Sequence, residues 1–296
     1  MRVGFIGLGA MGLPMAKNVI KASHELFTMV HTRKEPGDEL AALGATVLKT
    51  PREIARESEA VITIVPADAE LMEVVLGENG LIGELSSSKV LIEMTTAMSA
   101  TMLRVAGELK PTGVGVIDAP VSGGTPKAAS GELTIIAGAA KETLETYRPL
   151  LEAMGTTIFH VGPVGTGKVA KMVNQIMSAV HMAIIGEAFA LGKKAGADPA
   201  TLGEVIRQSS GYSRMLDLRL DDFLLAGSFE PGFKLDLMKK DVNLAIDSGQ
   251  ELNVPMPVAS AAAQLFTAAS CAGDGAKDFA AVGRYIASVA GVELER

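Results

Sequence analysis

Short apolar runs alternate with helical patterns along the first half of the chain. The runs lie at residues 2–6, 26–30, 60–65, 90–94, 115–117, 133–137 and 157–161. Between them, apolar positions recur at helical spacing in residues 40–44, 51–58, 69–76, 100–109 and 142–154. Strands that alternate with helices in this way predict a doubly wound α/β domain, a mostly parallel sheet with helices on both faces.

The second half of the chain has a different pattern. Residues 164–194 contain no proline, and their apolar positions cover nearly the whole helical circumference, which is typical of a helix buried on most sides. Only helical patterns follow, at residues 199–208, 215–226, 235–251, 257–269 and 278–290. We therefore predict an α/β domain at 1–163, a long interdomain helix at 164–194 and an all-α domain at 195–296.

Composition narrows the class of protein. A chain of 296 residues is long enough for two domains with separate cores. The net charge of −7 argues against broad contact with nucleic acid or anionic membrane, so an anionic substrate would need a local positive pocket. One cysteine, Cys271, excludes an internal disulfide, and the four scattered histidines offer no metal-ligand spacing. Without a signal-peptide pattern, and with every apolar run interrupted before about 18 residues, we expect a cytoplasmic protein that does not span a membrane.

A G-x-G-x-x-G pattern follows the first predicted strand directly. Gly7, Gly9 and Gly12 are its glycines, Ala10 and Met11 lie between the last two, and helix-forming residues follow. Such glycines allow a tight turn and let a pyrophosphate approach the N-terminus of the helix, where free N–H groups favour anions. A ligand-free strand-turn-helix is the alternative, but the position at the first strand favours a Rossmann-type dinucleotide-binding domain.

The end of the second predicted strand bears on which dinucleotide is bound. Thr32, Arg33 and Lys34 follow His31, and no Asp or Glu stands where NAD-binding domains hold the ribose 2′-hydroxyl group. An arginine nearby accepts a 2′-phosphate instead. The segment therefore favours NADP over NAD, against the alternative of a solvated loop with incidental charge.

Two later segments are candidates for the same groove. Val65, Pro66 and Thr96 end predicted strands, and ligands of open α/β sheets sit beyond the carboxyl ends of the strands. Further along, Ser122, Gly123 and Gly124 offer a hydroxyl group and bare backbone N–H groups, which suit a carboxylate. A glycine-rich hairpin without a ligand explains that second segment equally well.

Polar residues interrupt the long helix near its start. Lys171, Asn174 and Ser178 stand three and then four residues apart, so they share one face. Lys171 fits an ordinary lysine whose stem packs while its ammonium group reaches water, or a proton donor and acceptor at a cleft between domains. Lys240 and Asp241 pose a similar choice between solvated helix charges and a functional site.

Four segments of the chain stand out, in this order: GFIGLGAMGLPMAKN (Gly4 to Asn18), DAPVSGGTPKAASG (Asp118 to Gly131), GPVGTGKVAKMVNQ (Gly162 to Gln175) and KKDVNLA (Lys239 to Ala245). With these segments the chain resembles the β-hydroxyacid dehydrogenases, which include 3-hydroxyisobutyrate dehydrogenase, tartronate semialdehyde reductase and the glyoxylate/succinic semialdehyde reductases. Together they span essentially the whole chain.

The resemblance implies a role for each matched residue. Lys171 matches the catalytic lysine of the family, Ser122 to Gly124 match its carboxylate-binding turn, and Asn174 matches its substrate-contacting asparagine. Thr96 and Lys240 match cofactor contacts, whereas Phe233 and Asp241 match residues that line the substrate cleft. Two departures exist. Ser23 and His24 replace a frequent glycine, and His31 to Arg33 differ from the Asn-Arg-Thr of NADPH-preferring members.

These residues suggest a mechanism. Reduction of an aldehyde by hydride leaves negative charge on oxygen, so a group that gives up a proton must lie within about 3 Å of it. We expect Lys171 to be that acid, and the base in oxidation, with Lys168 and Lys240 as neighbouring cations that lower its pKa from about 10.4. The alternatives are an imine reductase or a non-enzymatic nucleotide-binding module of the same fold, and an intact Lys171 counts against both. Family members also imply a homodimer or homotetramer.

Overall fold

The computed structural model describes residues 1–295, which form two compact units divided between Lys171 and Met172. The first unit contains a nine-stranded sheet in the order β3-β2-β1-β4-β5-β6-β8-β7, with β9 paired to β8. Its strands are β1 (Arg2–Ile6), β2 (Glu25–Met29), β3 (Thr46–Leu48), β4 (Ala60–Thr63), β5 (Val90–Glu93), β6 (Gly115–Asp118), β7 (Val121–Ser122), β8 (Thr134–Ala139) and β9 (Thr157–Gly162). Only the pairs β6–β8 and β7–β8 are antiparallel among the described strands.

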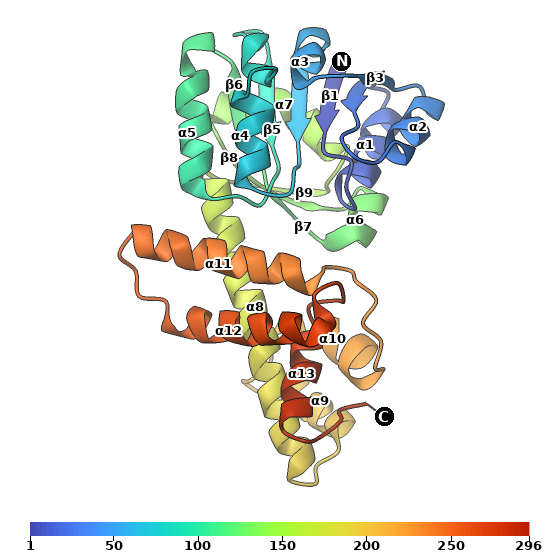
Figure 1. The fold of residues 1–296 in the computed structure, drawn as a ribbon, viewed down its shortest axis with the longest axis vertical. Helices are drawn as coiled ribbons and strands as arrows, with labels where there is room; N and C mark the ends of the chain where they lie inside the picture. The colour runs from blue at the N-terminus through green and yellow to red at the C-terminus, as the bar shows by residue number, and fades with distance from the viewer. Residues whose placement is uncertain (296) are drawn as a thin grey trace. The chain divides into compact units, whose positions relative to one another are not determined.

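Helices cover both faces of this sheet (Figure 1). They are α1 (Gly12–Lys21), α2 (Glu35–Ala42), α3 (Pro51–Glu57), α4 (Asp68–Leu76), α5 (Ser99–Leu109), α6 (Gly124–Ser130) and α7 (Lys141–Glu152), with short 3-10 turns at Leu81–Gly83 and Lys110–Thr112. Residues of α3, α4 and α5 share one buried cluster, and residues of α1, α6 and α7 share another. The doubly wound, mostly parallel sheet expected from the sequence is thereby confirmed.

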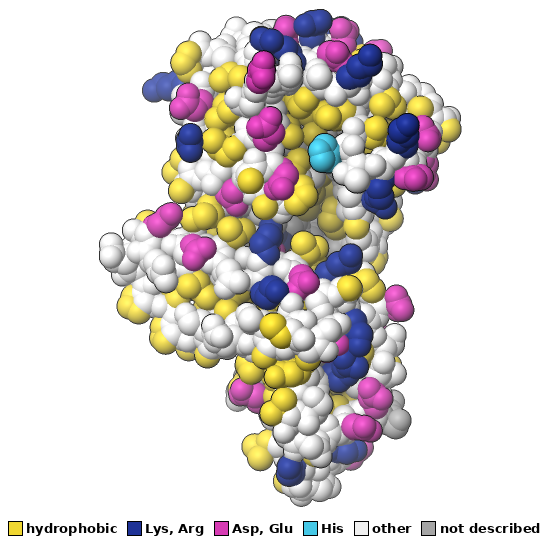
Figure 2. Space-filling model, in the orientation of Figure 1, with side chains coloured by type: hydrophobic (Ala, Val, Ile, Leu, Met, Phe, Trp, Pro, Cys, Tyr) yellow, Lys and Arg dark blue, Asp and Glu magenta, His cyan; other side chains and the backbone are white. Residues whose placement is uncertain are grey.

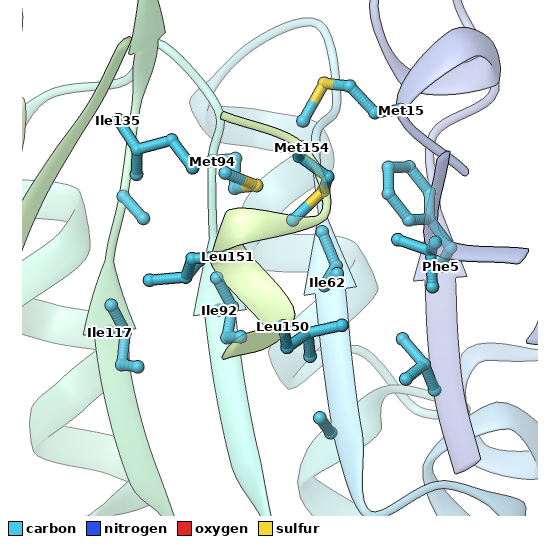
Figure 3. Packing of buried hydrophobic residues seen from close by; sticks show 14 of the residues in the cluster. Phe5, Met15, Ile62, Ile92, Met94, Ile117, Ile135, Leu150, Leu151 and Met154 are labelled. Atoms are coloured by element: carbon cyan, nitrogen blue, oxygen red, sulfur yellow. The ribbon is translucent and has the colours of Figure 1, made fainter. Parts of the chain in front are cut away.

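The central strands are apolar throughout because both of their faces are covered. All four residues of β4 and of β5 are buried. On one face, Leu150 and Leu151 of α7 and Met154 beyond it pack over Ile62 and Ile92 of the sheet (Figure 3). This packing fixes the carboxyl ends of the strands, where the candidate residues lie.

The long helix α8 (Thr166–Lys194) has 29 residues, and the boundary between the two units falls within it. Gly186 interrupts the apolar run of α8, as expected, yet an 18-residue window of this helix still has a mean hydropathy of 1.3. By length and composition the helix could therefore cross a membrane. Ala179, Met182 and Phe189, however, pack in the core of the second unit, and core helices pass the same test.

The second unit is all-helical, as expected. After α8 come α9 (Pro199–Arg207), α10 (Arg214–Arg219), a π-helical segment (Leu220–Leu225), α11 (Leu235–Glu251), α12 (Pro257–Ala269), a second π-helical segment (Ser270–Asp274) and α13 (Ala281–Val289). Asp198 caps α9, because its Oδ2 accepts a hydrogen bond of 2.8 Å from the N–H of Thr201. Helices α11 and α12 lie side by side (Figure 1). One apolar cluster contains buried residues of α8, α10, α11, α12 and α13.

Three short elements differ from the expected ones. Strand β3 is three residues long and mostly exposed, so it lacks the apolar run of a buried strand. Strand β7 has two residues, and helix α6 begins at Gly124, inside the segment that was expected to be a glycine turn. Ser23 has a φ of 64° in the turn after α1, a left-handed conformation that glycine adopts more readily.

Candidate functional site

The glycine turn between β1 and α1 is built from three glycines with different constraints. Gly7 has a φ of 105°, and a Cβ atom there would lie 2.0 Å from the carbonyl oxygen of Ile64. A Cβ atom at Gly12 would lie 1.8 Å from the carbonyl oxygen of Gly7. A Cβ atom at Gly9, in contrast, would meet no atom of the described chain within 4 Å. Internal packing therefore requires glycine at the first and third positions, whereas the second leaves open space for a ligand.

The N-terminus of α1 is suited to an anion. Within residues 1–295, no side chain caps this helix and no acidic residue stands in its first turn. Ala10 is exposed and Met11 is half-buried, so the backbone just before the helix is accessible. Uncapped N–H groups at a helix N-terminus, together with the open side of Gly9, fit the pyrophosphate of a dinucleotide.

The residues after β2 are exposed and positively charged. Thr32, Arg33 and Lys34 are all exposed, and the hydroxyl group of Thr32 lies 2.9 Å from Nδ1 of His31. Neither cation forms an ion pair with the rest of the described chain, as far as salt bridges of up to 4.0 Å are concerned. The cations are therefore available to a phosphate.

The carboxyl ends of β4 and β5 are tied together. The backbone N–H of Val65 donates a hydrogen bond of 3.0 Å to Oγ1 of Thr95, a buried side chain. Val65, Pro66 and Thr96 all lie just beyond these two neighbouring strands; Val65 and Thr96 are half-buried, and Pro66 is exposed. The structure thus brings the three sequence-predicted residues to one edge of the sheet.

The segment Ser122–Gly124 combines a strand end with the start of a helix. Gly123 and Gly124 have φ values of 137° and 71°, which glycine adopts at low cost. Gly123 is exposed, and Ser122 and Gly124 are half-buried. The backbone here is therefore open, as a carboxylate-binding segment requires, although it leads into α6 rather than into a simple turn.

Lys168 belongs to a buried charge cluster with Glu93 and Asp118. All three side chains are fully buried, and Lys168 Nζ is paired with Glu93 Oε2 and lies 3.1 Å from Asp118 Oδ1. Asp118 Oδ2 accepts hydrogen bonds from the backbone N–H groups of Gly165 (3.0 Å) and Lys168 (3.1 Å), at the start of α8. Burial alone would lower the pKa of Lys168, but the two carboxylates outweigh it and the pKa is raised.

This arrangement corrects one expectation. Lys168 was expected to act as a cation that lowers the pKa of Lys171, yet its charge is already compensated by two carboxylates. Lys240 is likewise paired, with its Nζ 3.1 Å from Oδ1 of Asp241. For Lys168 the physical reason is burial, since a fully buried ammonium group is stable only beside acidic partners.

Lys171 follows one turn after Lys168 on α8. Its side chain is buried, with 7% of its surface exposed. Most lysines keep the ammonium group in water, so this degree of burial is unusual and favours a specific role over a solvated helix charge. The carboxylate of Asp118, which caps the preceding turn, positions the part of the helix that carries Lys171.

In the second unit, a chain of hydrogen bonds connects α8 with α11. Asn174 Nδ2 donates to Gln175 Oε1 at 3.1 Å, and Gln175 Nε2 donates to Asp241 Oδ2 at 2.7 Å. Gln175 and Asp241 are buried, whereas Asn174 is exposed. Phe233 packs differently, because its ring meets Phe279 edge-on at 6.0 Å.

Sequence reasoning missed Gln175, Glu93 and Asp118 as parts of these networks. Gln175 lies four residues after Lys171, so it is closer to the helical face of Lys171 than Asn174 is. Glu93 was detectable as an acidic residue at the end of an apolar strand. The residues that the structure describes contain no group of three His, Cys, Asp or Glu side chains arranged for a metal ion.

Comparison with protein families places both units. Residues 2–162 match the NAD-binding domain of 6-phosphogluconate dehydrogenase. Residues 165–286 match the model described as "NAD-binding of NADP-dependent 3-hydroxyisobutyrate dehydrogenase". The two models together cover nearly the whole chain, in the order expected of a dinucleotide-binding oxidoreductase.

Comparison with individual proteins indicates the same family as the two family models. The chain is 35% identical to 2-(hydroxymethyl)glutarate dehydrogenase of Eubacterium barkeri, over 99% of this chain and 97% of the relative. It is also 35% identical to 2-hydroxy-3-oxopropionate reductase of Escherichia coli, over 93% and 92% of the two chains. The structure of 3-hydroxyisobutyrate dehydrogenase of Mycobacterium tuberculosis, with L-serine, matches with a TM-score of 0.87 and 29% identity, over 96% of this chain and 98% of that one. The chain belongs to the β-hydroxyacid dehydrogenase family, and is an NAD(P)-dependent hydroxyacid dehydrogenase.

Proposed function

We propose that this enzyme reduces a small carboxylated aldehyde, such as tartronate semialdehyde, succinic semialdehyde or glyoxylate, to the hydroxy acid, and that Lys171 donates the proton. The observation that carries the proposal is the burial of Lys171, one turn after the capped start of α8. A shielded ammonium group at a fixed position is what a general acid for a developing alkoxide requires.

The bound NAD(P)H supplies the hydride to the carbonyl carbon, and the residues of this chain do the rest. Lys171 protonates the carbonyl oxygen in reduction and takes the proton back in oxidation. Ser122 and the N–H groups of Gly123 and Gly124 hold the carboxylate of the substrate. Asn174, Phe233 and Asp241 orient the substrate. Every residue of this set belongs to a segment that matches the family, apart from Phe233, which lies shortly before such a segment.

The proposed cofactor contacts follow the carboxyl ends of the strands. Gly7 to Gly12, with Ala10 and Met11, hold the pyrophosphate, while Val65, Pro66, Thr96 and Lys240 contact the remainder. We propose NADP as the preferred cofactor, because Thr32, Arg33 and Lys34 are exposed and residues 30–34, which follow β2, contain no Asp or Glu. Glu35 opens α2, one residue beyond these cations.

A homodimer or homotetramer is the proposed assembly. Val173, Met177, Ile184 and Leu191 are exposed and stand four, seven and seven residues apart on α8, so they form one apolar stripe. Val258 at the start of α12 is 64% exposed, and Figure 2 shows apolar side chains on the surface of the α11–α12 pair. Burial of such side chains between subunits is favourable. A location in the cytoplasm, as expected from the sequence, belongs to the same proposal.

A panel of aldehydes tests the proposed activity. The purified protein is assayed with NADPH and NADH against the three carboxylated aldehydes, and against butanal and propanal, which lack the carboxylate. We expect turnover of at least one carboxylated aldehyde and a loss of kcat/KM of about 100-fold or more without the carboxylate, since charge-assisted hydrogen bonds are worth about 1.5–3 kcal/mol each. Equal turnover of butanal, or turnover of a cyclic imine alone, would contradict the proposal.

A further inference from the structure

The buried charge cluster carries one uncompensated negative charge. The carboxylate oxygens of Glu93 and Asp118 face donors: Glu93 Oε1 accepts from the N–H of Thr95 at 2.9 Å and from the hydroxyl group of Thr63 at 3.4 Å, Asp118 Oδ2 accepts from two backbone N–H groups, and the remaining oxygens face Lys168 Nζ. Carboxylates that only accept are ionised. Two negative charges and the single positive charge of Lys168 therefore leave a net charge of −1.

The sheet order locates this charge relative to the cofactor. The pyrophosphate-binding turn follows β1, and the residues expected at the adenosine ribose follow β2 on one side of it. Strands β4, β5 and β6 lie on the other side of β1, so their carboxyl ends belong to the nicotinamide half of the groove. Glu93 ends β5 and Asp118 ends β6.

Burial makes the charge effective at a distance. All three side chains are fully buried, so neither water nor salt screens them closely. The nicotinamide ring carries a positive charge in NAD(P)⁺ and none in NAD(P)H, because the oxidised ring gains two electrons and one proton as a hydride. A fixed negative charge near the ring stabilises the first form and hardly affects the second.

We propose that the Glu93–Asp118–Lys168 cluster discriminates between the two oxidation states of the bound cofactor and favours the oxidised one. Preference for the oxidised form makes the bound reduced form a stronger hydride donor, which assists reduction of a carbonyl group. If the separation is taken as about 10 Å and the effective dielectric constant as about 20–40, Coulomb's law gives a roughly four- to fifteenfold change in the ratio of the two dissociation constants. A tenfold change corresponds to about 30 mV for a two-electron couple.

Three variants separate charge from structure. Glu93→Gln and Asp118→Asn each remove one negative charge and leave the cluster neutral, although they alter different hydrogen bonds. The double variant Glu93→Gln/Lys168→Met removes one charge of each sign and keeps the net charge of −1. The dissociation constants of NADP⁺ and NADPH, and of NAD⁺ and NADH, are measured by calorimetry and by nicotinamide fluorescence, without substrate.

Both neutral variants should bind the oxidised cofactor about four- to fifteenfold more weakly relative to the reduced one, for whichever nucleotide pair binds. The double variant should keep the wild-type ratio. An unchanged ratio in the neutral variants, or an equal shift in the double variant, would show that the cluster acts only structurally. Thermal unfolding shows whether each variant is folded. If one neutral variant fails to fold, the ratio of dissociation constants of the other neutral variant tests the proposal.

Discussion

Gln175 donates a hydrogen bond of 2.7 Å from Nε2 to Oδ2 of Asp241, and both side chains are buried. This bond assigns the orientation of the Gln175 amide, because only its NH₂ group can face a carboxylate. Gln175 Oε1 then points to Asn174 and accepts its N–H at 3.1 Å. The carboxylate of Asp241 thereby determines how Asn174 is held, through one intermediate side chain.

Replacement of Gln175 should reveal this dependence. Gln175→Leu leaves Asp241 without its buried amide donor, so we expect a loss of about 1–3 kcal/mol in the free energy of unfolding. Asn174→Ala removes an exposed side chain and should cost less than about 0.5 kcal/mol. Urea denaturation measures both values. If the two variants were equally stable, the hydrogen bond to Asp241 would contribute nothing measurable.

Lys171 should be essential for turnover and dispensable for cofactor binding. Lys171→Ala removes the proposed proton donor, so kcat for aldehyde reduction should fall by about 10²–10⁴-fold. The dissociation constant of NADPH should change less than about threefold, since the groove for the pyrophosphate lies elsewhere in the first unit. Steady-state kinetics and fluorescence titration provide the two readouts. Retained turnover would remove Lys171 from the mechanism.

Two glycines of the turn should respond differently to alanine. Gly12→Ala places a Cβ atom 1.8 Å from the carbonyl oxygen of Gly7, so we expect a loss of at least about 3 kcal/mol of stability. Gly9→Ala meets no atom of the described chain within 4 Å and should leave the melting temperature unchanged. It should still weaken NAD(P) binding, because the methyl group occupies the open side of the turn. Unimpaired binding by the Gly9 variant would place the pyrophosphate elsewhere.

The sequence predicted helices and strands correctly where buried residues form a regular apolar pattern along the chain. The residues of β4 and β5 are all buried, so their apolar runs predicted strands correctly. Strand β3 lies at the edge of the sheet and is mostly exposed, so its residues carry no such pattern. Helix α6 begins with Gly-Thr-Pro, a composition typical of turns, and was missed for that reason.

The sequence indicates candidate residue types for the site but not their pairings. The glycine spacing and the four segments point to Gly7, Ser122, Lys171 and Asp241 without any coordinates, and these roles stay predictions. The partners of Lys168 are 75 and 50 residues away in the chain, and no local spacing indicates that such residues meet. Charge compensation of Lys168 therefore reversed the expectation that it acts as a free cation.

Alkaline pH should selectively weaken the contribution of Lys168 to stability. Burial alone would lower its pKa, but Glu93 and Asp118 raise it above the value of about 10.4 in the unfolded chain. The folded state then holds more protons than the unfolded state, so this contribution is complete below about pH 10.4 and is lost as the pH rises towards the folded pKa.

The double variant Glu93→Gln/Lys168→Met measures that contribution. The difference in unfolding free energy between wild type and variant should be constant from about pH 8 to pH 10, and should then decline by up to about 1.4 kcal/mol per pH unit. Lys49→Met, at an exposed lysine, is the control and should show no such decline. A constant difference up to pH 11 would mean that the pKa of Lys168 is not raised.

Arg33 should decide between the two nucleotides. It is exposed in the segment between β2 and α2 and forms no ion pair with the described residues, so its guanidinium group is available to a 2′-phosphate. Arg33→Ala should weaken NADP⁺ binding about 10- to 100-fold, the equivalent of one lost charge-assisted hydrogen bond of about 1.5–3 kcal/mol. Binding of NAD⁺, which has a 2′-hydroxyl group instead, should change less than about threefold and serves as the internal control. Calorimetric titration of both nucleotides gives the ratio directly, and an equal loss for both would assign Arg33 to the turn itself and leave the preference to other residues.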